Sequence, residues 1–355
     1  MADLIKKAME VGFDKVQEPS MLLSNLFKKV QLKTTKVEVQ GRVVDNIYSV
    51  DVKMGTGARR QTLSEFDTQE FTVPEYNDMT VITEEDVCKV NFGETEYTNK
   101  AANVANLIND RQKPLSLMQR RAEEKQASDS LFFGMVVLAG GTKISYKKKA
   151  THDITPATKW NATGGDPIED IRKAIELCIT DGRLAATEFN LWMEDSGLTA
   201  LLANEKFQKN SDANKGIKRT DIAIPVEKTP GGLFHGRITV GSNIVNIWSY
   251  NEKYTIPKGF GFENEGTQVG YIPKGCALLT PANPNFKKYY GAINNVNAPS
   301  NSLGGAKLQL VEVEQLPYAY DELDDGSAVT KAGVKSRPLY VPVDVDSFAT
   351  FKGLV

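Results

Sequence analysis

Residues 114–133 read PLSLMQRRAEEKQASDSLFF, and this stretch decides much of the fold. Its apolar residues Leu115, Met118 and Ala122 follow one another at spacings of three and four, which is the period of an α-helix. The helical pattern extends over residues 98–137, and Pro114 predicts a break or a first-turn position within it. A helix over these 20 residues has a length of roughly 30 Å.

This helix carries many charged side chains, which are expected to form its exposed face. Exposure to water alone would explain such a face, without a functional role. They are Arg120, Arg121, Glu123, Glu124, Lys125 and Asp129. Adjacent acids such as Glu123 and Glu124 point in divergent directions on a helix, so they are poor partners for acid–base catalysis.

Extended runs around a glycine-rich tip precede this helix. Residues 34–40, 47–54 and 64–74 are strand-like, and the basic tip at residues 55–60 lies between the last two. These strands predict a long hairpin with too few apolar residues for a core of its own. An isolated two-stranded ribbon is only marginally stable in water. The tip lacks the Gly-Lys-Ser/Thr ending of a phosphate loop. A further strand is predicted at residues 79–83.

A second helix is predicted from a sharp start at residues 166–169. Asp166 can cap it, Pro167 fits the first helical position, and Glu169 can complete a capping box. Its apolar face consists of Ile168, Ile171, Ala174, Ile175 and Cys178.

The rest of the chain is expected to contain mostly strands and turns. After a strand at residues 188–193, Asp195 or Ser196 is expected to cap a helix that reaches Phe207, and residues 209–222 are expected to form an exposed loop. The cluster from Asp321 to Asp325 is interpreted as a solvated acidic turn, with a divalent-ion contact as the alternative. Further extended segments are predicted at residues 237–240, 244–248, 276–280, 308–313 and 337–343.

Composition argues against several classes of function. The chain has 43 Lys and Arg residues against 45 Asp and Glu residues, a balance that argues against tight nucleic-acid binding. No run of 18 apolar residues occurs, so no membrane span is expected. Residues 1–13 lack the apolar centre of a signal peptide, and their apolar spacing predicts a short amphipathic arm.

Patterns typical of catalysis or metal binding do not occur in the sequence. Cys88, Cys178 and Cys276 have neither disulfide nor zinc spacing, and we expect them to be small buried residues in a reducing compartment. The histidines are only His152 and His235. Neither a nucleophile elbow nor a His-Glu-x-x-His motif occurs. The sequence therefore favours a structural role, with no enzyme activity, no cofactor and no metal.

The order of features over residues 25–355 resembles the lambda major head protein family, also called phage capsid family E. Each motif is short, but their shared order along most of the chain makes the resemblance specific. The motifs are Glu70-Phe71-Thr72-Val73-Pro74, Gln119-Arg120-Arg121-Ala122-Glu123-Glu124, Lys159-Trp160, Gly165-Asp166-Pro167-Ile168-Glu169-Asp170-Ile171, Leu191-Trp192-Met193, Gly236 with Ile247-Trp248-Ser249-Tyr250, Tyr271-Ile272-Pro273-Lys274-Gly275, Ala277-Leu278-Leu279-Thr280, Ser336-Arg337-Pro338-Leu339-Tyr340-Val341-Pro342, Asp344 and Phe348.

This resemblance implies an α+β fold, the Hong Kong 97-type capsid fold, in five parts. These are an N-terminal arm (1–34), an extended loop hairpin (35–80), a peripheral domain with a long spine helix (81–184), an axial domain (185–325) and a C-terminal return to the peripheral domain (326–355).

The resemblance also implies a function: a major capsid protein that assembles as hexamers and pentamers into the icosahedral head shell around the double-stranded DNA of a tailed phage. The implied partners are other copies of the chain, a scaffold, a portal and, in some members, a decoration protein, with DNA contacted non-specifically and no membrane. Assembly is expected in the host bacterial cytoplasm and the finished shell in the virion. An encapsulin-like cellular compartment is the main alternative, and a soluble hydrolase with an unrecognised carboxylate site is a remote one.

Contacts between subunits are expected at the extended loop and on the spine helix. Backbone hydrogen bonds and charge pairs along a hairpin can hold a neighbour, and mixed charges can set its register. As a hypothesis, Arg59 and Arg60 meet carboxylates of an adjacent subunit. The residues predicted for these contacts are Met54, Gly55, Gly57, Arg59, Arg60, Glu65, Arg120, Arg121, Glu123 and Glu124.

Overall fold

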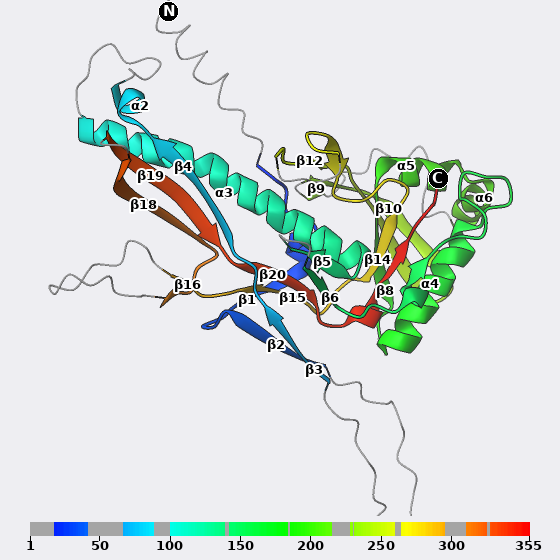
Figure 1. Ribbon diagram of the computed structural model, residues 1–355. Coiled ribbons are helices and arrows are strands. Elements are labelled where there is room, and N and C mark those ends of the chain that lie inside the picture. Colours follow the sequence, from blue (N-terminus) through cyan, green and yellow to red (C-terminus); the bar gives the residue numbers. More distant parts are fainter. Residues whose placement is uncertain are drawn as a thin grey trace, which may run out of the picture.

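The structure is a computed structural model with a long helix and a narrow sheet at one end and a wider sheet with helices α4, α5 and α6 at the other (Figure 1). A third sheet lies between these two ends. The structure describes residues 18–41, 67–88, 100–138, 142–183, 185–214, 228–229, 231–259, 264–294, 310–324 and 327–355.

Helix α3 (Lys100–Phe132) packs on one face of the narrow sheet. That sheet is antiparallel, in the order β18 (Gln315–Asp324), β19 (Ser327–Ser336) and β4 (Tyr76–Ile82). Gln119 of α3 donates hydrogen bonds to the Asp78 carboxylate and the Val334 carbonyl, at 3.0 and 2.7 Å. The strand predicted at residues 79–83 is confirmed as part of β4.

The expected break at Pro114 is wrong, because α3 continues through it. A proline has no N–H to donate to the carbonyl four residues earlier, here that of Asp110. Both residues are exposed, so water can satisfy this carbonyl. Gln112 donates to the Tyr318 carbonyl at 2.9 Å and Ser116 bonds to Gln315, so contacts on both sides of the proline hold the helix against the sheet.

The wider sheet has seven strands in the order β7, β21, β14, β8, β11, β10 and β9. Strand β8 pairs parallel with β11 and antiparallel with β14. The strands predicted at residues 188–193, 237–240, 244–248 and 276–280 are confirmed. The bounds of these strands are β7 (Asp153–Ile154), β21 (Ala349–Phe351), β14 (Ala277–Pro281), β8 (Glu188–Met193), β11 (Asn243–Tyr250), β10 (Gly232–Val240) and β9 (Lys228–Thr229).

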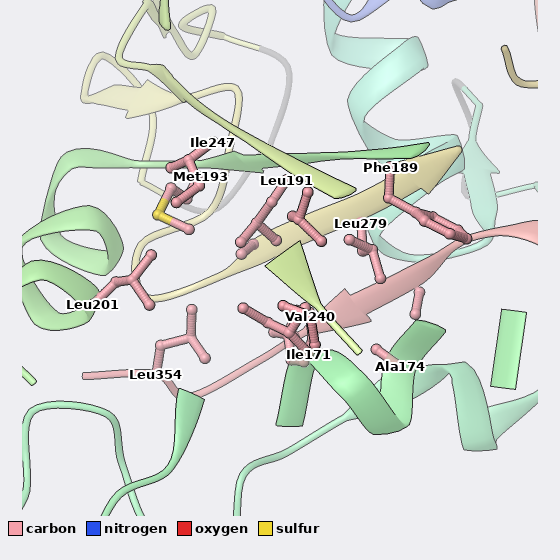
Figure 2. Packing of buried hydrophobic residues seen from close by; sticks show 14 of the residues in the cluster. Ile171, Ala174, Phe189, Leu191, Met193, Leu201, Val240, Ile247, Leu279 and Leu354 are labelled. Atoms are coloured by element: carbon pink, nitrogen blue, oxygen red, sulfur yellow. The ribbon is translucent and has the colours of Figure 1, made fainter. Parts of the chain in front are cut away.

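Helix α4 (Pro167–Gly182) packs against this sheet and begins at the predicted residue, while the Glu169 carboxylate bonds to Arg172. The Asp166 side chain accepts a hydrogen bond from the Glu169 amide at 3.2 Å, and Pro167 is the first helical residue. The predicted apolar face is confirmed, since Ile171, Ala174, Ile175 and Cys178 are buried and Ile168 packs against the same cluster. Figure 2 shows Ile171 and Ala174 within this cluster, together with residues of the sheet.

The helix predicted to reach Phe207 is in fact two helices, α5 (Asp195–Ala203) and α6 (Glu205–Asn214). Asn204 separates them, because its side-chain oxygen accepts the amides of Lys206 and Phe207 at 3.0 and 3.1 Å and so caps α6. The N-cap of α5 is Glu194, so the predicted cap was also wrong. Helix α6 includes residues 209–214 of the predicted loop, and 215–222 lie outside the described residues.

The third sheet consists of β1 (Phe27–Gln31), β15 (Phe286–Tyr290) and β20 (Pro338–Pro342). Strand β15 pairs parallel with β1 and antiparallel with β20. Phe27, Phe286 and Tyr340 pack in one cluster with Ala127 and Leu131 of α3, which ties the N-terminal segment to the helix. The extended segment predicted at residues 337–343 is confirmed as β20.

The two described ends of the predicted hairpin pair with each other. Strand β2 (Lys36–Gly41) lies antiparallel to β3 (Asp67–Thr72), and residues 42–66, including the predicted strand at 47–54, lie outside the described residues. The remaining short elements are α2 (Glu84–Cys88), β5 (Met135–Val137), β6 (Lys143–Ser145), β12 (Lys253–Thr255), β13 (Gln268–Gly270), β16 (Ile293–Asn294), β17 (Leu310–Val311) and the 3-10 helices Ser24–Leu26, Ala150–His152 and Val345–Ser347.

The acidic turn predicted from Asp321 to Asp325 is wrong for its described part. Residues Asp321 to Asp324 belong to β18, and Asp325 lies outside the described residues. Asp321 accepts a hydrogen bond from Thr330 at 2.8 Å, and Glu322 forms an ion pair with Lys331. Cross-strand partners on β19 therefore hold these acids in a strand.

Candidate functional site

Glu123 of α3 lies in a pocket of hydroxyl groups. Its carboxylate accepts hydrogen bonds from Tyr290 at 2.8 Å and Tyr340 at 3.1 Å, and Ser336 lies 3.5 Å away. Burial raises the pKa of Glu123, while the tyrosine hydrogen bonds and the nearby charge of Lys288 oppose that shift. These contacts join α3 to β15, β19 and β20.

Glu124 points to a different set of partners. It accepts the backbone amides of Leu23 and Ser24 at 2.8 and 2.9 Å and the Tyr250 hydroxyl at 3.0 Å. Burial raises the pKa of Glu124 to about 7, although these hydrogen bonds favour the ionised form. This carboxylate therefore connects α3 to the N-terminal segment and to β11.

The prediction that Glu123 and Glu124 lie on an exposed face is wrong. Their relative exposures are 3% and 0%, so in this structure they present no surface to a neighbouring subunit. The physical reason is that the elements facing α3 supply hydroxyl and amide donors, which require buried acceptors. Arg120 is exposed, Arg121 and Lys125 are half-buried, and Lys125 forms an ion pair with Asp129.

The predicted contact residues of the extended loop lie outside the described residues. They are Met54, Gly55, Gly57, Arg59, Arg60 and Glu65. The base of the hairpin is anchored, because Val37 and Val73 are buried and the Phe71 ring packs edge-on against Tyr146 with centroids 5.6 Å apart.

An apolar patch, formed by Met79, Val81 and Tyr320, lies on the face of the narrow sheet opposite α3. These side chains are 53%, 41% and 38% exposed. In the strand register, Val81 lies opposite Lys331, which in turn lies opposite Tyr320. This patch was not among the predicted contact residues. The signal was present, since Met79, Val81 and Ile82 place apolar side chains on both faces of one strand.

Three buried titratable side chains elsewhere, those of His152, Cys178 and Lys148, take part in packing or hydrogen bonding. His152 is buried, with its ring nitrogens 2.9 Å from the Phe348 carbonyl and 3.1 Å from Asp181. Burial raises the pKa of Cys178 to about 12, which keeps this thiol protonated and unreactive. The Lys148 side chain is buried and bonds to Asp153 at 2.7 Å and Thr350 at 2.6 Å.

Two absences hold for the part of the chain that the structure describes. Across these residues, no group of three or more His, Cys, Asp or Glu side chains could hold a metal ion. None of the helices among them is long and apolar enough to cross a membrane.

Comparisons with solved structures identify the fold. A prophage capsid protein from E. coli CFT073 is 16% identical, with 95% of this chain and 93% of that chain covered and a TM-score of 0.62. The capsid of a native GTA particle is 10% identical, with 97% and 93% covered and a TM-score of 0.50. An encapsulin from Synechococcus elongatus reaches a TM-score of 0.40 at 9% identity, with 95% and 88% covered. The α+β fold is therefore that of the Hong Kong 97-type capsid proteins.

Sequence comparison identifies the family. No curated protein matches this sequence. The family model described as phage major capsid protein E matches residues 14–352, nearly the whole chain. Since the fold and the family match agree, the chain belongs to the phage major capsid protein E family and is a structural subunit of a capsid shell.

Proposed function

We propose that the chain assembles as hexamers and pentamers in which the extended loop of one subunit lies against the apolar patch of the next. Such a shell would enclose the double-stranded DNA of a tailed phage. The exposed patch on the narrow sheet is the observation that carries this proposal. An apolar patch of this kind on a sheet typically marks a surface that another protein covers.

The apolar patch faces away from α3, which covers the opposite face of its sheet. Gly333 lies opposite Met79 and Tyr318, and the Tyr318 ring covers it. Lys331 and Glu322 form an ion pair beside the patch, and Lys335 lies over the Tyr318 ring. An extended chain could therefore combine apolar contact with charge pairing there.

The hairpin could supply the other side of this contact by covering the apolar patch of a neighbouring subunit. Strands β2 and β3 point away from the rest of the described chain, and only their base packs in a cluster, through Val37, Phe71 and Val73 (Figure 1). A ribbon that projects in this way gains stability when a second surface covers it. Individual contacts in a shell are modest, and their repetition around a closed assembly supplies the overall affinity.

Substituting Val81→Glu tests the apolar patch, with Val81→Thr as the matched control. A buried charge at the contact should abolish most shell formation, whereas threonine keeps the β-branched shape and should leave many more shells. Electron microscopy and size-exclusion chromatography of the purified protein measure the yield. If circular dichroism shows that both proteins are folded, equal shell yields for the wild type and Val81→Glu would exclude the patch as a contact.

Reversing both charges at Arg59 and Arg60 tests the loop tip separately. The double substitution to glutamate should lower the shell yield, because like charges would then meet the carboxylates proposed on the neighbour. The double substitution to glutamine should have a smaller effect. An unchanged yield after charge reversal would show that the tip does not contact carboxylates.

The other proposed partners follow from this assembly. A scaffold and a portal would direct shell growth in the bacterial cytoplasm, and some shells would also bind a decoration protein. The formal net charge of −2 fits a wall that encloses DNA with non-specific contacts, since no large positive charge is available to bind it tightly. The contact surface would comprise the extended loop, the apolar patch and the exposed part of α3 around Arg120.

A further inference from the structure

Two lysines, here called the lysine pair, lie side by side in the third sheet without a carboxylate partner. Strand β1 pairs with β15 in parallel register, so Lys28 lies opposite Lys287 and both side chains are on the same face. Lys28 is exposed and Lys287 is half-buried. Across the residues that the structure describes, neither of them forms an ion pair. Like charges at directly opposite positions destabilise a sheet, so the lysine pair favours an anion from outside the chain.

The adjacent row of the same two strands shows how this chain neutralises such a pair. Lys29 lies opposite Lys288 on the face toward α3. Lys29 forms an ion pair with Glu314 at 2.5 Å. Burial raises the pKa of Glu123, and Lys288 lies close enough to that carboxylate for its charge to oppose the shift. The lysine pair on the other face has no such carboxylates beside it.

The lysine pair lies near the base of the hairpin formed by β2 and β3. Val30 and Tyr289 follow it on the same face of the two strands. They pack in one cluster with Val37 and Val73 of the hairpin base. The face that carries the lysine pair therefore continues into the surface from which the extended loop leaves the subunit.

Carboxylates gather at one end of the narrow sheet, here called the acidic end. Ile82 of β4, Thr330 of β19 and Asp321 of β18 share one rung of this sheet, and α2 begins two residues after Ile82. The acidic end adjoins the apolar patch, because Val81 directly precedes Ile82. Its members are all exposed and comprise Glu84, Glu85, Asp321 and Glu322.

The acidic end is too far away to neutralise the lysine pair of its own chain. Arg111 of α3 lies 3.9 Å from Asp86 of α2, whereas Ala127 of α3 packs in one cluster with Phe27 and Phe286 of the third sheet. These two positions of α3 are roughly 24 Å apart along the helix axis. Figure 1 shows the same arrangement, with α2 at one end of α3 and the third sheet toward the other.

We propose that the lysine pair of one subunit binds the acidic end of the next subunit in the shell. This contact rests on the proposed assembly and adds a second contact to it. The extended loop leaves its own subunit beside the lysine pair, and the apolar patch on which it is proposed to lie adjoins the acidic end of the neighbour. Charge complementarity and this shared position favour a second copy of the chain as the source of the anion. Such charge pairs would set the orientation and register of the loop on its neighbour.

Charge reversal followed by rescue tests the contact in the full-length protein, expressed alone so that no genome is packaged. Lys28→Glu combined with Lys287→Glu should lower the shell yield on the order of tenfold, because carboxylates would then meet carboxylates. Adding Glu84→Lys and Asp321→Lys to the same chain should restore most of the yield, since opposite charges meet again. Electron microscopy and size-exclusion chromatography measure the yield, and circular dichroism shows that each variant is folded.

A matched control separates this contact from a general effect of net charge. Lys253→Glu combined with Lys274→Glu changes the net charge equally at two exposed lysines outside both surfaces and should leave the yield near that of the wild type. If the lysine-pair variant does not fold, Lys28→Gln combined with Lys287→Gln replaces it and should still lower the yield.

The wild type distinguishes failure of this contact from failure of the assembly. If the wild type forms no shells, the proposed assembly itself fails. If wild-type shells form and substitution of the lysine pair leaves their yield unchanged, this contact is overturned while the assembly stands. A loss that the substitutions at the acidic end do not rescue also overturns it, because the anion then lies elsewhere.

Discussion

Helices α4 and α3 each bury one face, and the two faces differ in how many polar side chains they contain. In α4 the buried face is apolar and contains Ile171, Ala174, Ile175 and Cys178. In α3 the apolar Met118 is 51% exposed. The buried side chains of α3 include the polar Gln119, Glu123, Glu124, Gln126, Ser128 and Ser130, beside the apolar Ala127, Leu131 and Phe132 near its C-terminal end.

The surfaces that face the two helices explain this difference. Helix α4 meets strands whose inward side chains are Leu191, Leu279 and their apolar neighbours, so burial of hydrocarbon decides its orientation. Helix α3 meets the hydroxyls of Tyr250, Tyr290 and Tyr340. Buried donors need acceptors, so the carboxylates of α3 turn inward. Apolar periodicity therefore predicts the buried face only where the opposing surface is apolar.

The largest effect is expected from truncation of the apolar face of α4. Ile175→Ala should lower the free energy of unfolding by about 2–5 kcal/mol, because it removes buried hydrocarbon and leaves a cavity. Urea unfolding of the dissociated subunit, followed by tryptophan fluorescence, measures the change. Lys173→Ala, at an exposed position of the same helix, should change stability little. Similar losses for both substitutions would contradict the assigned orientation of α4.

An intermediate effect is expected at the polar face of α3. Glu123→Leu should lower the free energy of unfolding by about 1–3 kcal/mol, because the buried hydroxyls of Tyr290 and Tyr340 lose their acceptor. Glu123→Gln, which keeps a side-chain oxygen, should be less destabilising. The same urea titration compares the two variants. If the leucine variant is as stable as the wild type, apolar packing could replace the network, and the contrast between the helices would fail.

The smallest effect is expected at the exposed side of α3. Met118→Gln should change the free energy of unfolding of the dissociated subunit by no more than about 0.5 kcal/mol, because the side chain is already half in water. Thermal unfolding by circular dichroism is sufficient to detect a larger change. A loss above 1 kcal/mol would mean that Met118 contributes to the core of the single chain.

Local signals allowed much of the fold to be predicted. The cap of α4 joins residues only three positions apart, and the hairpin strands follow from alternation within each run. Asn204 carried a comparable local signal, because a side-chain oxygen that bonds two and three residues ahead is typical of an N-cap. That signal was missed, and the continuous helix through Phe207 was predicted instead.

The candidate site could not be predicted in the same way. Glu124 meets the Leu23 amide across 101 residues, and Glu123 meets Tyr290 and Tyr340 across 167 and 217 residues. No spacing in the sequence indicates such pairs. The helix through Pro114 has a similar origin, since contacts to β18 on both sides of the proline offset the lost backbone hydrogen bond.

The sequence by itself determined the period and the ends of individual elements, the balance of charge and, through the order of its motifs, the resemblance to a capsid family. Only the tertiary structure decided which face of α3 is buried, that Glu123 and Glu124 lie inside, and that Met79, Val81 and Tyr320 lie outside. The physical reason is that hydrogen-bond capping and hydrophobic periodicity act within a few residues of the chain. The free energy of burying a carboxylate instead depends on donors that distant segments bring to it.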